Sequence, residues 1–192
     1  MANLHAIHSV GASIVTYLRN VYPEPLRTDH ACDFRLISSG ELAGNEEFGT
    51  MLSFFLYRIT INEYLRNRQR TGSFADHIPP LSLDLHYLVS IWATSPLTEQ
   101  VVLAWAMNHL HQHPILDASS LSPEGGWQAG DFIHIIPAEL SNEDIMRIWD
   151  ALDPAYRLSV SYIARAVRID PDDATTLMPV VATRFGWEEH SS

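Results

Sequence analysis

Apolar residues recur at intervals of three and four near the start of the chain. The pattern runs from Leu4 to Val21 and stops at Pro23 and Pro25. This is the period of a helix with one face on a core, and proline does not continue it. An opening amphipathic helix is therefore predicted, with an apolar stripe formed by Leu4, Ile7, Gly11, Ile14, Leu18 and Val21.

Five later segments have the composition or the alternation of β-strands. Segment 51–61 (MLSFFLYRITI) is rich in aromatic and β-branched residues, and segment 81–94 (LSLDLHYLVSIWAT) alternates at period two. Segments 33–38 (DFRLIS) and 132–136 are shorter, and segment 156–169 (YRLSVSYIARAVRI) alternates again. In 81–94 we expect one apolar face, formed by Leu83, Leu85, Tyr87, Val89 and Ile91.

A long helix is predicted to begin after Ser95. Proline follows at position 96, and proline at the first helical position loses no hydrogen bond. The Ser95 oxygen is the expected cap for the free amides of the first turn. The heavy apolar content from Pro96 to about His111 predicts close packing of this helix on the sheet.

A shorter helix is predicted to begin at Ser141 and to end near Leu152. Ser141 is the expected cap, and Asp144 places a carboxylate near the helix N-terminus. Leu140 and Ile145 have the spacing of a hydrophobic staple.

The predicted order is one helix, three strands, then helix, strand, helix and strand. An early run of strands favours an α+β fold with a mixed, mostly antiparallel sheet of about four to five strands covered by helices. Segments 63–80 and 117–131 are long connections in this scheme. The length of 192 residues suits one domain, assigned to residues 1–170, followed by an arm or tail at 171–192.

The charge balance excludes several functions. Acidic residues outnumber basic ones by 23 to 12, and the formal net charge of -11 repels a nucleic-acid backbone. All 12 basic residues are arginine, which excludes Schiff-base and P-loop lysine chemistry. The single cysteine suits a reducing compartment, and no signal peptide or membrane span is recognisable. We expect a cytoplasmic chain that binds no nucleic acid and does not insert into a membrane.

Three histidines at 109, 111 and 113 precede Pro114 and raise the question of a metal site. His109 and His113 are four residues apart and share a helical face, a spacing that zinc enzymes use, whereas His111 points away from both. No Glu-containing signature or nearby Cys, Asp or Glu completes a ligand set. The alternative is a helix end, where histidines bond the last carbonyls and favour the dipole. A histidine-dependent metal enzyme is therefore the weaker hypothesis.

Other catalytic motifs are missing from the sequence. Cys32 follows Asp29 and His30, but adjacency in sequence does not place a base against a thiol. There is no G-x-S-x-G, P-loop or G-x-G-x-x-G pattern, and the glycine pair 125–126 is interpreted as a simple turn. We predict that the chain is not an enzyme and needs no cofactor.

Two features are candidates for protein contacts. Three alternating arginines form a dense basic patch in segment 63–80, which is either a solvated loop or a docking site for an acidic protein rim. Two aromatic residues near the end of the chain either pack on the body or anchor a neighbour. These candidates are Arg66, Arg68, Arg70, Phe185 and Trp187.

Several ordered stretches together resemble a known family. They are FFLYRITINEYLRN (54–67), LSLDLHYLVSIWATS (81–95), LAWAMNHLHQHPIL (103–116), IHIIPAELSNEDIMRIWDAL (133–152) and YRLSVSYIARAVRID (156–170). The chain resembles the N-terminal domain family of cap, or tube-terminator, proteins of phage-tail-like contractile injection systems. The resemblance spans nearly residues 1–170 and carries no catalytic signature.

The resemblance implies a phage tail-terminator-like fold and an assembly role. The expected protein forms a hexameric ring that caps the inner tube, ends tube growth and links tube protein to sheath protein. A generic phage or prophage tail-completion protein is the alternative with the same ring architecture. The particle would be assembled in the cytoplasm and then either released or anchored at a membrane.

Overall fold

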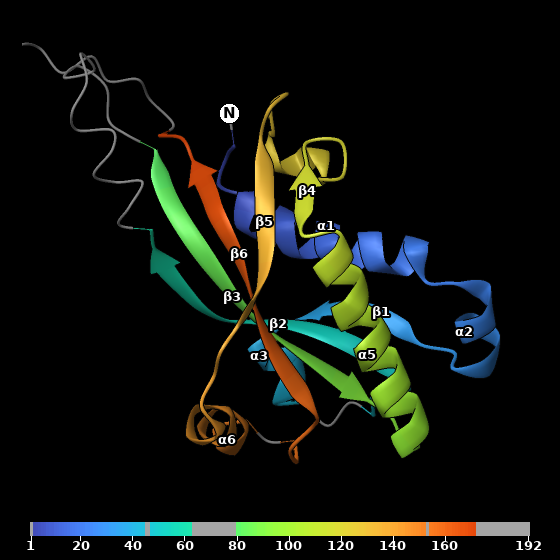
Figure 1. The fold of residues 1–192 in the computed structure, drawn as a ribbon. Helices are drawn as coiled ribbons and strands as arrows, with labels where there is room; N and C mark the ends of the chain where they lie inside the picture. The colour runs from blue at the N-terminus through green and yellow to red at the C-terminus, as the bar shows by residue number, and fades with distance from the viewer. Residues whose placement is uncertain (1, 45–46, 63–79, 153, 172–192) are drawn as a thin grey trace, which may run out of the picture.

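The computed structural model describes residues 2–44, 47–62, 80–152 and 154–171. Figure 1 shows a six-stranded sheet with the strand order β1-β2-β3-β6-β5-β4. The strands are β1 (Asp33–Ile37), β2 (Met51–Ile61), β3 (Leu81–Trp92), β4 (Ile115–Asp117), β5 (Phe132–Ala138) and β6 (Ser159–Ile169). The helices are α1 (Ala6–Val21), α2 (Glu24–Asp29), α3 (Ser39–Leu42), α5 (Pro96–Gln112), the 3-10 turn η2 (Pro123–Gly125) and α6 (Asn142–Asp150).

The predicted α+β class and mostly antiparallel sheet are confirmed. Among the described strands, β1 pairs with β2 in parallel and every other pairing is antiparallel. The strand count is slightly higher than expected, because β4 supplies three residues at the edge of β5. A segment this short leaves no periodicity for a sequence pattern to detect.

The inner face of the sheet carries the main core. α1 and α5 lie on this side (Figure 1). The predicted apolar face of β3 is confirmed, since its five residues are all buried in this core: Leu83, Leu85, Tyr87, Val89 and Ile91. Each buries an apolar side chain that strengthens the packing by roughly 1.5–3 kcal/mol relative to exposure.

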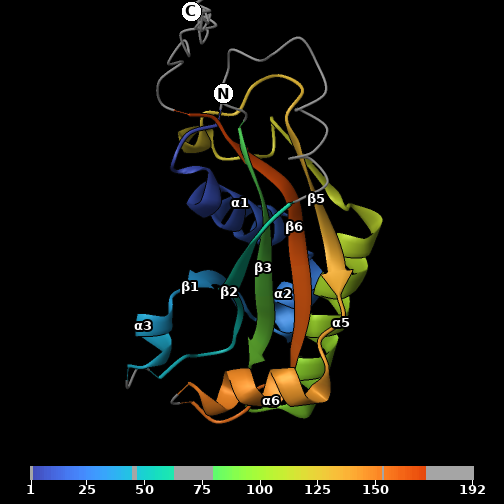
Figure 2. The ribbon, with the colours of Figure 1, turned by 90° about the vertical axis from the view of Figure 1, so that its left-hand side faces the viewer.

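The outer face is covered at one end. There α3 and α6 close a second apolar cluster against β1, β2 and β3, as Figure 2 shows for α6 across the end of the sheet. Trp149 of α6 is 4% exposed and contacts Trp92, with ring centroids 6.1 Å apart. The Trp149 indole N–H donates to Ser159 Oγ at 3.2 Å, which fixes α6 to β6.

The two predicted serine caps have different outcomes. Ser141 Oγ accepts the Asp144 amide at 3.1 Å, so this cap is confirmed. Ser95 precedes α5 in extended conformation, but its side chain makes no capping hydrogen bond, so that prediction was wrong. Proline at the next position removes one of the free amides of the first turn and supplies a helical φ, so the helix begins there without a side-chain cap.

Candidate interaction surfaces

The half of the outer face that α6 and α3 leave uncovered is here called the open sheet face (Figure 2). The strand register defines it, because paired residues point to the same side of a sheet. Arg58 of β2 is opposite His86 of β3, and His86 is opposite Ile163 of β6. The remaining members on β6 and β5 are Arg165, Phe132, His134 and Ile136.

The centre of the open sheet face is apolar. Ile163 is opposite Ile136, and both are partly exposed. Phe132 is 53% exposed, and its ring contacts His134 with centroids 5.3 Å apart. Large apolar side chains left uncovered next to polar groups are typical of a contact surface between proteins.

The charged groups around this centre are Arg58, Arg165 and, on the edge strand β4, the exposed Asp117, which is paired with Phe132. Arg58 is exposed and has no acidic partner among the residues that the structure describes. Burial and the Arg58 charge lower the pKa of His86, against a raising effect of Asp84. A hydrogen bond of 2.9 Å joins His86 Nε2 to the Thr60 hydroxyl and holds the imidazole between β2 and β3.

The carboxylate of Asp84 already accepts hydrogen bonds within the sheet. The Asp84 side chain is 16% exposed, and its Oδ1 accepts from Asn62 Nδ2 and from the Ala166 amide, each at 3.0 Å. Arg165 Nε lies 3.8 Å from Asp84 Oδ2, and the Arg165 side chain is 45% exposed. The guanidinium groups of Arg58 and Arg165 therefore remain available to an incoming acidic partner.

A second surface, on α6, has the opposite charge. It is called the acidic helix face and consists of the exposed residues Glu143, Met146, Arg147 and Asp150, and the exposed Tyr156 beyond the helix packs on Trp149 with ring centroids 6.2 Å apart. Met146 and Tyr156 are each 47% exposed. Glu143 pairs with Arg147 at 2.6 Å, an exposed i,i+4 pair of small energetic weight.

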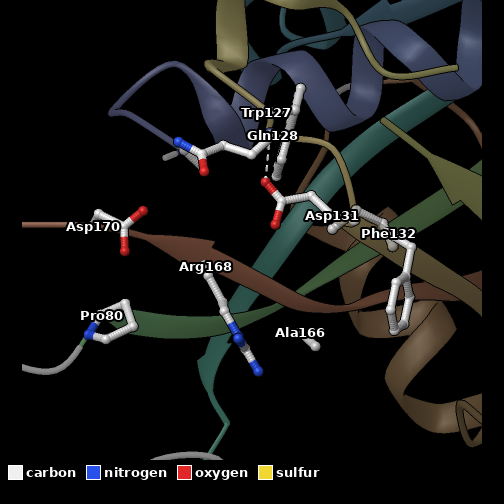
Figure 3. A pocket seen from close by; sticks show the side chains of 11 residues that line it. Pro80, Trp127, Gln128, Asp131, Phe132, Ala166, Arg168 and Asp170 are labelled. Atoms are coloured by element: carbon white, nitrogen blue, oxygen red, sulfur yellow. Dashed lines mark hydrogen bonds between the residues drawn. The ribbon is translucent and has the colours of Figure 1, made fainter. Parts of the chain in front are cut away.

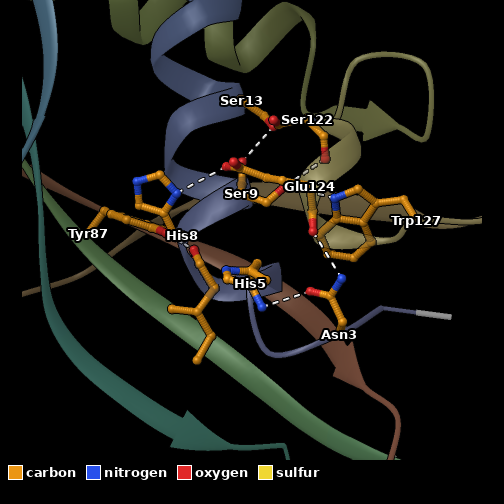
Figure 4. Close-up of polar contacts among 10 residues, drawn as sticks. Asn3, His5, His8, Ser9, Ser13, Tyr87, Ser122, Glu124 and Trp127 are labelled. Atoms are coloured by element: carbon orange, nitrogen blue, oxygen red, sulfur yellow. Dashed lines mark hydrogen bonds and ion pairs between the residues drawn. The ribbon is translucent and has the colours of Figure 1, made fainter. Parts of the chain in front are cut away.

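The turn predicted at the glycine pair is present as the 3-10 turn η2, which Gly126 ends at a φ of 70°, and the loop around it docks on α1 (Figure 4). Ser9 Oγ donates to the Ser122 carbonyl and accepts from the Trp127 indole, both at 2.9 Å. Ser13 Oγ accepts the Ser122 amide at 2.7 Å. These contacts leave no room for a side chain at Gly125 and are structural in character.

A cavity of about 220 Å³ lies at the end of the sheet where β5 and β6 meet the N-terminus (Figure 3). Arg168, Asp170 and Gln128 are among the residues that line it. Asp131 Oδ2 accepts a hydrogen bond from the backbone N–H of Gln128 at 2.8 Å, within the same loop.

The histidines before Pro114 have a structural arrangement. His109 stacks on Trp105 at an interplanar angle of 15°, and its Nε2 hydrogen bonds to the Tyr17 hydroxyl at 3.0 Å. The carbonyl contacts expected for this side chain are thus replaced by a contact to α1. The His109 and His113 rings lie 4.7 Å apart. No group of three or more His, Cys, Asp or Glu suited to a metal ion occurs among the described residues.

Cys32 has the properties of a packed thiol. Burial raises its pKa to about 12, which disfavours the thiolate that a nucleophile requires. His30 is not its base, because His30 Nδ1 hydrogen bonds to Thr98 Oγ1 at 3.0 Å. The Cys32 thiol donates instead to the Asp33 carbonyl at 3.2 Å.

The five residues named as interface candidates from the sequence lie outside the described residues: Arg66, Arg68, Arg70, Phe185 and Trp187. The open sheet face was not predicted. The sequence indicates it only in segment 156–169, where Ile163 and Arg165 lie on the side of the predicted strand that mixes polar and apolar residues. That signal is weak, because only the register shows that these two residues face Arg58 and His86.

Two solved structures are similar to this fold. The sheath/tube terminator of an extracellular contractile injection system, PVC, in its extended state aligns with a TM-score of 0.56 and 20% identity, over 97% of this chain and 64% of the terminator. The tube-terminating cap of the anti-feeding prophage, AFP, aligns with a TM-score of 0.52 and 17% identity, over 90% of this chain and 61% of the cap. No curated protein sequence matches the chain.

The architecture is therefore that of the terminator caps of contractile injection systems, of which this chain spans less than two thirds. The sequence profile of the Pvc16 N-terminal domain matches residues 9–183. The chain belongs to this family. None of the helices in the described part of the chain is long and apolar enough to cross a membrane.

Proposed function

We propose that this protein caps the inner tube of a contractile injection system and ends its growth. The observation that carries the proposal is the shared fold, which extends over 97% of the chain in the comparison with the sheath/tube terminator. Family membership over residues 9–183 supports the same role. The tube protein and the sheath protein are the proposed partners, and the cap acts without catalysis.

The proposed assembly is a hexameric ring that forms in the cytoplasm and becomes part of the particle. A ring that closes by rotation requires two different complementary surfaces on each copy. Two surfaces of opposite charge, the open sheet face and the acidic helix face, support this arrangement. The division into a cap domain (1–170) and an arm (171–192) belongs to the same proposal.

Two segments that lie largely outside the described residues, 63–80 and 171–192, are proposed to contribute contacts. Segment 63–80 carries Arg66, Arg68 and Arg70, and the arm carries Phe185 and Trp187. Charged rim residues set orientation and association rate, whereas aromatic anchors supply most of the affinity. Deletion of residues 171–192 is expected to weaken attachment to the particle, and normal assembly and tube length after this deletion would contradict a role for the arm.

The capping role is tested in particles produced with and without this protein. Electron microscopy of negatively stained particles measures the length of tube and sheath. Loss of a terminator predicts tubes of irregular length and detached sheath, with restoration by the protein supplied in trans. Particles of normal length and complete sheath in its absence would exclude the proposal.

A further inference from the structure

The open sheet face and the acidic helix face complement each other in charge and in their apolar centres. One presents Arg58 and Arg165 around Ile136 and Ile163. The other presents Glu143 and Asp150 on α6 beside the exposed Met146, with Arg147 paired to Glu143. We propose that the open sheet face of one copy of this chain binds the acidic helix face of a second copy.

The two surfaces of a single copy are held apart. Trp149 is 4% exposed and packs in the cluster at the covered end of the sheet, which fixes the position of α6. The exposed residues of α6, Glu143, Met146 and Asp150, therefore lie on a different side of the helix from Trp149. Only another molecule can place Glu143 and Asp150 over Arg58 and Arg165.

The overall charge makes a second copy with an acidic helix a fitting partner. The protein has a formal net charge of -11, so two copies repel unless a basic surface is turned toward the contact. Arg58 lacks an acidic partner among the described residues, and Arg165 is only loosely paired with Asp84. The open sheet face thus provides the cationic surface through which copies can approach.

The apolar centres provide the burial that charges alone do not. Phe132 is 53% exposed, and Met146 and Tyr156 are each 47% exposed. Covering such side chains contributes about 25 cal/mol per Å² of apolar surface, whereas exposed ion pairs contribute about 0–1 kcal/mol. The arginines would fix the register of the contact, and the aromatic and aliphatic side chains would hold it.

The contact is heterologous, since the two participating surfaces differ. Repetition of a heterologous contact gives a closed ring when the rotation between copies closes. This contact rests on the ring of the proposed function and assigns the two surfaces through which neighbouring copies bind. It is tested on the purified protein alone, whereas capping is tested by tube length, so failure of either is recognised separately.

The experiment uses charge reversal on each surface. The first variant carries Arg58→Glu and His134→Glu, and the glutamate at position 134 lies directly opposite Arg165. The second carries Glu143→Arg and Asp150→Arg. A control with Gln100→Glu, Ala104→Glu and Asn108→Glu makes the same change in net charge as the first variant, on the exposed side of α5.

The readout is mass in solution by light scattering, with circular dichroism to verify folding. The wild type and the α5 control are expected to associate beyond the monomer mass of 21.7 kDa. The association constant of each reversal variant is expected to be at least about tenfold lower. An equal mixture of the two reversal variants is expected to recover the association, because each now complements the other. A wild type that stays monomeric, a reversal variant that associates normally, or a mixture that fails to recover would overturn the proposal.

Discussion

Asp84 and Ala166 are joined across β3 and β6, where the Asp84 carboxylate accepts the Ala166 amide at 3.0 Å. The pairing of the two strands shifts register at this point, and Ala166 has a φ of 64°. A non-glycine residue in this region is strained, and the hydrogen bond from its amide compensates for the strain. Arg165, which precedes Ala166, reaches the open sheet face by the regular alternation of β6 with β5.

Substitution of this carboxylate is expected to destabilise the sheet. Asp84→Ala leaves the Ala166 amide without its acceptor and should lower the free energy of unfolding by about 1–3 kcal/mol. Ala166→Gly relieves the backbone strain and should raise it by roughly 0.5–1 kcal/mol. Urea denaturation measures both, and a stabilised Asp84→Ala variant would contradict this account of the bulge.

The packing of the 117–131 loop on α1 predicts a sharp glycine requirement. A Cβ atom at Gly125 would lie 2.4 Å from Trp127 Nε1 and 2.8 Å from Ser9 Oγ. Gly125→Ala is therefore expected to lower the unfolding free energy by about 1–3 kcal/mol through overpacking. Gly49→Ala is the matched control, because no atom lies within 4 Å of its Cβ position. Equal melting temperatures for the two variants would show that the loop yields easily.

Trp149 is predicted to carry the attachment of α6. Trp149→Ala removes a buried aromatic side chain and its bond to Ser159, and should lower stability by about 3–5 kcal/mol. Met146→Ala, on the exposed side of the same helix, should change it by less than about 0.5 kcal/mol. Chemical denaturation monitored by circular dichroism separates the two sides of the helix, and similar losses from both variants would mean that the helix packs differently.

The histidine stack predicts a pH dependence of stability. Burial and the neighbouring His113 lower the pKa of His109 below its ordinary value near 6.5, so the folded chain favours neutral imidazole. The unfolded chain binds the proton more readily. The contribution of His109 to stability is therefore fully present above about pH 6.5 and is lost as the pH falls through the folded pKa.

The variant that isolates this effect is His109→Phe, which keeps an aromatic ring beside Trp105 and removes the titrating group. The wild type should lose more thermal stability than the variant between pH 8 and pH 5. Melting curves across that interval measure the difference. Parallel loss in both proteins would assign the pH dependence to other groups, among which His86 also has a lowered pKa.

Much of this fold follows from periodicity. The alternation in 81–94 predicts β3 and its buried face, and Ser141 with Asp144 predicts the start of α6. The helix in 96–111 is predicted correctly although Ser95 does not cap it, since proline and apolar content suffice. These features depend on local spacing, which a single sequence displays directly.

The contact surfaces depend on pairing, which a single sequence does not display. Arg58 and His86 are separated by 28 positions in the chain and become neighbours only through the register of β2 with β3. The contact of Tyr17 with His109 likewise joins helices distant in sequence. The sequence favoured a helix end over a metal site for the histidines and a turn for the glycine pair, but it did not display the packing of both on α1.

The strand order has a consequence for the timing of folding. β6 is inserted between β3 and β5, and its register joins Ile169 to Leu81 and Arg165 to His134. The two parts of the sheet consequently remain separate until residue 169 has left the ribosome. Pairing over such sequence distances is slow, so the edge of β3 that pairs with β6 stays open from the synthesis of β3 until β6 has been made. An unpaired strand edge is a site of non-native association with other chains, and this site persists until β6 has closed the sheet.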